Sequence, residues 1–217
     1  MDKDFILFDL DGTLTDPKLG ITKSVQYSLR CFGIHIDNLD DLIPFIGPPL
    51  RDSYQNLYSF SNEEAEKAVQ KYREYFSEQG IFENIIYDGI EIMLSNLYKN
   101  RKALIVATSK PFIFAKTILE HFKIDKYFSF ISGSELDGRR SNKDLVIEYA
   151  LENMRISDRN KAIMIGDRKH DIIGAKAASL DSIGVLYGYG DFLELSGAGA
   201  TYLVKSVDEL SKLLLHN

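Results

Sequence analysis

Short apolar runs recur along the chain, and they constrain its fold more than any other feature of the sequence. These runs are Phe5–Phe8, Ala103–Ala107, Phe128–Ile131, Ala162–Ile165 and Ile183–Leu186. Each is nearly continuous rather than alternating between apolar and polar residues, which is typical of parallel strands covered on both faces. Segments with the helical period separate them in the second half of the chain, as in Ile90, Met93, Leu94 and Leu97. This alternation predicts an α/β fold with a doubly wound parallel sheet flanked by helices.

Residues 17–84 interrupt the alternation, because they contain several helical patterns and no convincing strand. Ser61 and Glu64 have the spacing of a capping box at the start of a helix. Gly47-Pro48-Pro49 predicts a turn between two of these helices. The sequence therefore predicts two domains: a core formed by residues 1–16 and 85–217, and an inserted α-helical cap formed by residues 17–84.

The charge, the cysteine content and the apolar runs of the chain limit the kinds of partner and location that are expected. The formal net charge is −6 and there is no lysine-rich block, so a nucleic-acid polymer is not expected as a partner. Cys31 is the only cysteine, which suits a reducing, cytoplasmic location. The first residues show no signal-peptide pattern, and no apolar run approaches the roughly 18 residues of a membrane span, so no membrane association is expected.

Reactive polar side chains follow the predicted strands at their carboxyl ends or open the next helix. In chain order they are Asp9 and Asp11, Thr108 and Ser109, Lys143, and Asp167 with Asp171. The carboxyl ends of parallel strands meet at one edge of the sheet, where ligands bind in open α/β folds. We therefore expect these side chains to form one site.

The residue types at this edge are suited to phosphoryl transfer. Crowded carboxylates need a cation between them, and oxygen ligands suit Mg²⁺. One carboxylate can attack phosphorus, and a second, two residues away, can protonate the leaving oxygen and then activate water. Backbone N–H groups of Gly12 and Thr13, the Thr108 hydroxyl and the Lys143 charge could hold the transferring group.

Three segments resemble motifs of the haloacid dehalogenase superfamily of phosphohydrolases, in the subfamily with a helical cap inserted after the first motif. These segments are Asp9-Leu10-Asp11-Gly12-Thr13-Leu14-Thr15-Asp16, Val106-Ala107-Thr108-Ser109 and Gly166-Asp167-Arg168-Lys169-His170-Asp171. The resemblance covers nearly the whole chain and looks closest to phosphoglycolate phosphatase-like members. It implies a Rossmann-like core and an enzyme that hydrolyses phosphoric monoesters.

The resemblance also implies roles for individual residues. Asp9 would be the nucleophile and a metal ligand, and Asp11 the general acid/base, reaching the metal through its backbone carbonyl. Asp167 would complete the Mg²⁺ site, with Asp171 binding directly or through a neighbour. Thr108 and Lys143 would bind the transferring phosphoryl group, and Gly12, Thr13 and Ser109 the substrate. Lys143 is followed by Asp144 where relatives often have proline, so Arg139 or Arg140 remains the alternative source of positive charge.

The predicted substrate is a small phosphorylated metabolite, because a cap would enclose it. Gly47 and Arg51 are the candidate substrate-binding residues of the cap. Phosphoglycolate, a nucleoside monophosphate, pyrophosphate and other esters remain open, as does a monomeric or dimeric state. A phosphomutase of the β-phosphoglucomutase type is one alternative. A non-hydrolytic receiver-like module is another, although the inserted helices of residues 17–84 argue against it.

Overall fold

Strand β1 (Phe5–Phe8) lies inside a six-stranded sheet in the computed structural model, which describes residues 1–215. The strand order is β5-β4-β1-β6-β7-β8, and the neighbouring strands are parallel. The other strands are β4 (Ala103–Pro111), β5 (Phe128–Ser134), β6 (Ala162–Gly166), β7 (Asp181–Val185) and β8 (Tyr202–Val204). The order changes direction at β1, because the chain first builds toward β5 and then toward β8. A crevice at the carboxyl ends of the strands is expected at such a switch point.

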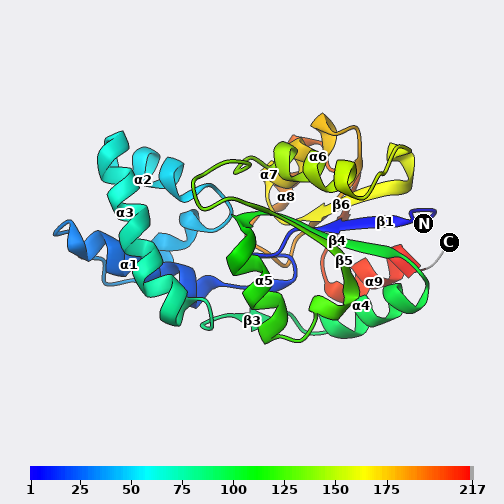
Figure 1. Ribbon diagram of the computed structural model, residues 1–217, viewed down its shortest axis with the longest axis horizontal. Coiled ribbons are helices and arrows are strands. Elements are labelled where there is room, and N and C mark those ends of the chain that lie inside the picture. Colours follow the sequence, from blue (N-terminus) through cyan, green and yellow to red (C-terminus); the bar gives the residue numbers. More distant parts are fainter. Residues whose placement is uncertain (216–217) are drawn as a thin grey trace. The chain divides into compact units, whose positions relative to one another are not determined.

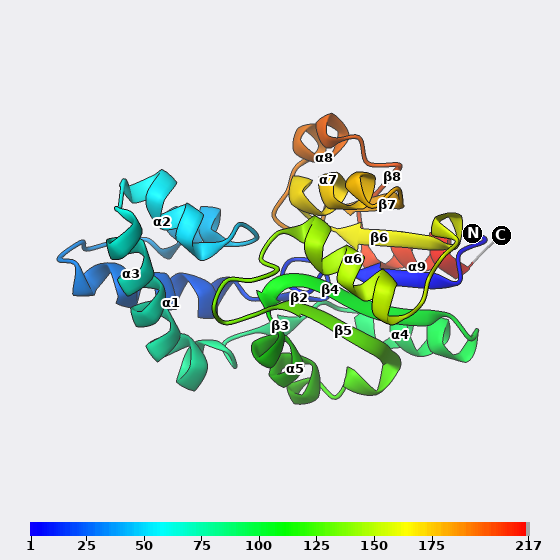
Figure 2. The ribbon, with the colours of Figure 1, turned by 45° about the horizontal axis from the view of Figure 1, so that its top comes forward.

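Helices cover both faces of this sheet (Figures 1 and 2). On one face lie α6 (Lys143–Asn153) and α7 (Lys169–Ala177), and α8 (Phe192–Ala198) packs against α7. On the other face lie α4 (Ile90–Lys99), α5 (Phe112–His121) and α9 (Val207–Leu215), while short 3₁₀ turns at Asp125–Tyr127 and Arg159–Lys161 precede β5 and β6. The predicted α/β class with a parallel, helix-flanked sheet is confirmed.

Burial on both faces explains the continuous apolar runs. Leu7 is in register with Ile105 on one side and Met164 on the other, and all three belong to the core beneath α6 and α7. Their neighbours Ile6 and Phe8 point to the opposite face and are equally buried. Apolar side chains are therefore needed at the three consecutive positions 6–8 of β1, which explains why the run does not alternate with polar residues.

Four of the five predicted strands differ from their predicted limits, and the smallest difference is in β6, which extends one residue further to Gly166. β4 and β5 extend past their apolar runs to Pro111 and Ser134, so Thr108 and Ser109 lie within β4. β7 begins at Asp181, before the predicted start, because its polar residue Ser182 is buried and receives a partner: its N–H donates to Thr201 Oγ1 at 3.0 Å. β8 was not predicted, since an edge strand of 3 residues carries too short a pattern.

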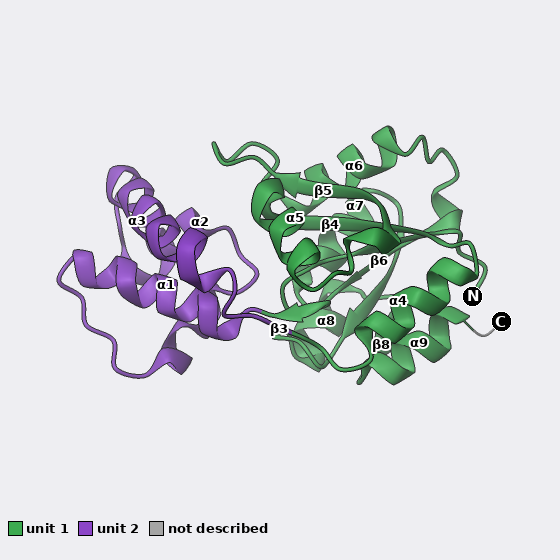
Figure 3. Cartoon of the chain, turned by 60° about the horizontal axis from the view of Figure 1, so that its bottom comes forward, with its two compact units in different colours: residues 1–16, 86–217 green, residues 17–85 purple. Residues whose placement is uncertain are grey.

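The chain divides into two compact units, residues 1–16 with 86–217 and residues 17–85 (Figure 3). The predicted boundary after residue 84 falls one residue earlier than the observed division. The chain forms a short strand at each passage between the units, β2 (Thr15–Asp16) and β3 (Ile85–Ile86). These two strands pair with each other. That residues 17–85 act as a cap remains a prediction.

The second unit is helical. It contains α1 (Lys18–Cys31), a 3₁₀ segment (Leu39–Phe45), α2 (Leu50–Tyr58), α3 (Asn62–Tyr75) and a π-helical turn (Phe76–Gly80). The predicted capping box is confirmed: Ser61 N–H donates to Glu64 at 2.8 Å, and Glu64 N–H donates to Ser61 Oγ at 3.3 Å. Its core includes Leu29, Tyr54 and Tyr72, which come from three different helices and are buried.

Candidate active site

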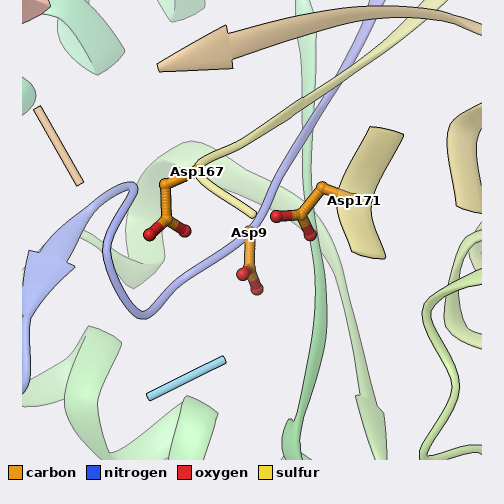
Figure 4. A group of neighbouring side chains, drawn as sticks. All are labelled: Asp9, Asp167 and Asp171. Carbon is orange, nitrogen blue, oxygen red and sulfur yellow. The ribbon is translucent and has the colours of Figure 1, made fainter. Parts of the chain in front are cut away.

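Three carboxylates converge at the carboxyl edge of the central strands (Figure 4). Asp9 follows β1, and its N–H donates to the Ile165 carbonyl at 2.8 Å, which continues the pairing with β6. Asp167 follows β6, and Asp171 lies in the first turn of α7. One ligand atom from each of the three lies within 4.8 Å of the others, and all three side chains are buried. The structure thus brings together the three carboxylates that the sequence predicts as metal ligands.

Lys143 is the cation that holds two of these carboxylates. Its Nζ lies 2.7 Å from Asp9 Oδ1 and 2.8 Å from Asp171 Oδ1, and it donates to the Ala107 carbonyl at 3.3 Å. The side chain comes from the first residue of α6 and is only 5% exposed. Burial by itself would lower the pKa of Lys143, but Asp171 and Asp9 raise it above the ordinary value, so the ammonium group stays charged.

The two arginines considered as alternatives lie elsewhere. Arg139 is exposed and pairs with Asp137 at 2.8 Å. Arg140 pairs with Glu135 and places its guanidinium over the ring of Tyr149, 3.8 Å from the ring centre. Lys143 therefore supplies the positive charge beside Asp9, and these arginines organise the β5–α6 loop.

Asp171 combines two roles that the sequence leaves open. Its Oδ2 accepts the Arg168 N–H at 3.0 Å and thereby caps α7, while Oδ1 faces Lys143. Burial raises the pKa of Asp171 to about 6; Lys143 opposes this effect, and Asp9 adds to it. Burial also raises the pKa of Asp167 well above its usual range, with further contributions from Asp171 and Asp9.

The donor set fits a hard divalent cation. The three carboxylates offer only oxygen atoms, as Mg²⁺ prefers. Burial and the neighbouring carboxylates raise the pKa of Asp167 and of Asp171, and one lysine serves Asp9 and Asp171 together, so an added cation would favour the ionised form of Asp167 and Asp171. Asp9, Asp167 and Asp171 could therefore hold a metal ion, while the contribution expected from the Asp11 carbonyl stays a prediction.

Asp11 is held by a residue that the sequence analysis missed. Lys110 Nζ lies 2.5 Å from Asp11 Oδ2, and the two side chains are 7% and 13% exposed. The second oxygen, Oδ1, is buried and has no hydrogen-bond partner among the described residues. Burial raises the pKa of Asp11, and Lys110 opposes that rise. The signal was Lys110-Pro111 directly after the motif that ends at Ser109.

Thr108 and Ser109 lie near the end of β4. Thr108 is buried, and its Oγ1 accepts the Lys110 N–H at 3.3 Å, which leaves the hydroxyl proton for another acceptor. Ser109 is half-buried, and its carbonyl accepts a hydrogen bond from Ser134 Oγ at 2.8 Å. Thr108 can therefore donate to a phosphoryl oxygen, whereas the side-chain role of Ser109 remains a prediction.

The loop after β1 differs from its expected role as an amide donor. The Gly12 N–H donates to the Thr15 carbonyl at 2.7 Å, and the Thr13 N–H donates to the Leu10 carbonyl at 3.3 Å. These two amides thus close the turn rather than point to a ligand, an outcome that residue identity alone does not predict. Gly12 instead provides space, because its φ is +84° and an added Cβ would lie 2.2 Å from Asp167 Oδ2.

A second loop, residues 187–190, packs closely against Asp167. The Tyr189 N–H donates to Asp167 Oδ2 at 2.8 Å, and Tyr187 donates its hydroxyl to the Thr13 carbonyl at 3.0 Å. A Cβ on Gly188 would lie 2.3 Å from Asp167 Cβ, and one on Gly190 would lie 2.1 Å from the Asp167 carbonyl oxygen. These contacts make the loop a support for Asp167.

Gly188→Ala is expected to displace Asp167 and weaken Mg²⁺ binding about tenfold or more, since supports of metal ligands carry effects of this size. Overpacking should also lower the free energy of unfolding by about 1–3 kcal/mol. Titration calorimetry with Mg²⁺ and thermal unfolding measure the two effects. Gly197→Ala is the matched control, because a Cβ there meets nothing within 4 Å. Unchanged Mg²⁺ affinity in Gly188→Ala would contradict the supporting role of the loop.

Gly47 and Arg51 belong to the second unit. Gly47 has a φ of +105°, in the region that favours glycine, and precedes the two prolines that lead into α2. Arg51 is exposed in the first turn of α2. Their expected contact with substrate remains a prediction.

Comparison with known proteins places the chain in a family. A model of the haloacid dehalogenase-like hydrolases matches residues 6–185, and the chain belongs to this family. A 5'-nucleotidase of Pseudomonas aeruginosa is 44% identical over 209 residues, which cover 96% of this chain and 94% of the relative. The tyrosine-protein kinase PtkA of Mycobacterium tuberculosis is 36% identical over 211 residues, covering 96% and 72%.

A solved structure agrees with these relatives. The crystal structure of a predicted phosphatase from Clostridium acetobutylicum is 53% identical, has a TM-score of 0.96 and covers 99% of both chains. The expected family and enzyme class are therefore confirmed: the chain is a haloacid dehalogenase-like hydrolase with phosphatase relatives and neighbours. Within residues 1–215, no helix has the length and apolar character needed to cross a bilayer.

Proposed function

We propose that the protein is a Mg²⁺-dependent phosphatase that hydrolyses small phosphate monoesters through an aspartyl-phosphate on Asp9. The observation that carries the proposal is the contact of Asp9 with Lys143 at 2.7 Å, inside a group of three carboxylates that could hold a metal. A carboxylate is a usable nucleophile when nearby positive charge draws in the phosphate and neutralises the charge that develops.

The charges of the site support a divalent cation. If all are ionised, its four carboxylates exceed its two ammonium groups by two negative charges. One Mg²⁺ would neutralise this excess and supply the charge stabilisation that an incoming phosphate dianion requires.

The chain's own residues supply the remaining steps. Asp9 attacks phosphorus while Asp11, in its acid form, gives its proton to the leaving oxygen. Asp11 then takes a proton from the water that cleaves the aspartyl-phosphate. Thr108 donates its hydroxyl proton, and Lys143 its charge, to the oxygens of the transferring group.

A nucleoside 5'-monophosphate is the substrate class we propose to test first, since a 44% identical relative is a 5'-nucleotidase. Phosphoglycolate and pyrophosphate are the other two compounds that we propose to assay first. A phosphate-release assay with Mg²⁺ across these compounds is the direct test. Absence of release from every ester, including p-nitrophenyl phosphate, would refute the proposal.

The same protein preparation can be tested for two other reactions, a phosphomutase reaction and a protein-kinase reaction. Incubation with hexose phosphates separates hydrolysis from mutase activity, because a mutase moves phosphate to another position without releasing it. Incubation with [γ-³²P]ATP and a tyrosine-containing peptide tests the activity named for the PtkA relative. We expect phosphate release with the ester substrates and no transfer in these two reactions.

Arg51→Ala is expected to raise KM about tenfold for substrates with a second anionic group and to leave KM for p-nitrophenyl phosphate unchanged, because one charge-assisted contact contributes about 1.4 kcal/mol or more. Steady-state kinetics with a nucleoside diphosphate and with p-nitrophenyl phosphate measure the difference. Arg30→Ala, also exposed and in the second unit, serves as the control. Equal changes for both substrates would remove Arg51 from a specificity role.

A further inference from the structure

Lys110 occupies an unusual place at the end of β4. The register between β4 and β5 shifts between Ala107 and Pro111, so the strand is irregular where Lys110 lies. The following proline restricts Lys110 to an extended backbone, and helix α5 begins at Phe112, directly after that proline. The backbone of this residue is therefore constrained on both sides.

The side chain ends at Asp11, and little of the pair is exposed to solvent. Nζ lies 2.5 Å from Asp11 Oδ2, with side chains 7% and 13% exposed. An ion pair with so little solvent exposure has little freedom to separate, because moving the ammonium group away would remove the nearest counter-charge of the Asp11 carboxylate. Lys143 pairs with Asp9 and Asp171, so the two lysines serve different carboxylates.

The two carboxylate oxygens of Asp11 therefore differ in their hydrogen-bond partners. Oδ2 is held by Lys110, whereas Oδ1 is buried and has no hydrogen-bond partner among residues 1–215. A buried oxygen without a partner is costly, and such atoms are found where a ligand completes the bonding. Asp11 thus presents one oxygen in a fixed orientation.

We infer that Lys110 is a positioning residue for Asp11: it anchors Oδ2 so that Oδ1 faces the oxygen whose proton is exchanged. This inference rests on the proposed acid/base role of Asp11. In the first step the proton on Oδ1 passes to the ester oxygen as its bond to phosphorus breaks and Asp9 bonds to phosphorus. In the second, Oδ1 takes a proton from water as the water oxygen replaces Asp9 on phosphorus.

Two aryl esters of similar shape test the inference. Phenyl phosphate has a basic leaving oxygen that needs a proton, whereas p-nitrophenyl phosphate needs little protonation. The parameter kcat/KM reports only steps up to the first transfer, so the later action of Asp11 on water does not enter. Lys110→Met should lower kcat/KM about 10–100-fold for phenyl phosphate and by less than about threefold for p-nitrophenyl phosphate, since general acid catalysis contributes about 10²–10⁴.

Further variants separate positioning from a purely structural role. Lys110→Arg, which keeps the charge and the donor, should recover much of the lost kcat/KM for phenyl phosphate. In an Asp11→Asn background, Lys110→Met should cause no further selective loss. Lys3→Met is the matched control, because Lys3 is buried, pairs with Asp181 at 2.6 Å and lies outside the site. If Lys110→Met fails to fold by circular dichroism, Lys110→Gln replaces it with the same expected order of effects.

The outcomes are distinct. An equal loss with both esters, or an additional loss in the Asp11→Asn background, would overturn the positioning role and show that Lys110 acts on phosphate or on the fold. If Asp11→Asn itself shows no preference between the esters, the proposed acid/base role of Asp11 fails. If Asp11→Asn discriminates between the esters and Lys110→Met does not, only the role of Lys110 fails.

Discussion

Asp9→Asn should abolish phosphate release, with a loss of about 10⁴-fold or more in kcat, the scale observed when a catalytic nucleophile is removed. Asparagine matches aspartate in shape but has no anionic oxygen to attack phosphorus. Lys143 keeps its contact with Asp171 at 2.8 Å, so the buried lysine is not left without a counter-charge. The variant should therefore fold, as circular dichroism and thermal unfolding would show.

Acid quenching during turnover of a ³²P-labelled ester provides the direct measurement. We expect label bound to the wild-type protein, located to Asp9 by mass spectrometry of the digested chain, and no label on Asp9→Asn. Asp181→Asn is the control, because this carboxylate pairs with Lys3 at the start of β7, outside the site. A folded Asp9→Asn protein with substantial turnover would exclude Asp9 as the nucleophile.

Removal of the metal is expected to have the second-largest effect. Treatment with EDTA should reduce phosphate release by about 10³-fold or more, equal to about 4 kcal/mol in the barrier, and added Mg²⁺ should restore it. The reason is that three buried carboxylates within 4.8 Å would repel a phosphate dianion if no cation neutralised them. Hydrolysis that persists at full rate in EDTA would contradict a metal-dependent site.

Thermal unfolding gives a second reading that does not depend on activity. Mg²⁺ at 100 times its dissociation constant should stabilise the protein by about 2.7 kcal/mol. Asp167→Asn should lose this stabilisation and, without metal, should be at least as stable as the wild type, because it removes one of the mutually repelling carboxylates. A full Mg²⁺-dependent shift in this variant would remove Asp167 from the ligand set.

Local features made much of the site predictable. Asp9 and Asp167 directly follow apolar strands, and Lys143 opens a helix, so their shared edge follows from the rule for parallel sheets. The strand β8 was missed because its 3 residues are too few for a pattern and Tyr202 is 42% exposed.

Other contacts depend on geometry that a linear pattern does not contain. The partner of Lys110 is set by an irregular stretch of β4, and the direction of the Gly12 and Thr13 amides is set by hydrogen bonds inside one turn. The support of Asp167 comes from residues 187–190, whose importance appears only when the space around each glycine is known. The reactive side chains at the strand ends could therefore be predicted from the sequence. The contacts that hold these side chains in position could not.

The central place of β1 also has a kinetic consequence. Asp9 and Asp167 are separated by 158 positions in the sequence (167 − 9) and become neighbours only when β1 pairs with β6. Contacts between such distant segments form late, because the intervening loop must close first. The candidate metal-binding group is therefore expected to form only when the core is nearly complete, so Mg²⁺, if bound, should slow unfolding rather than speed folding.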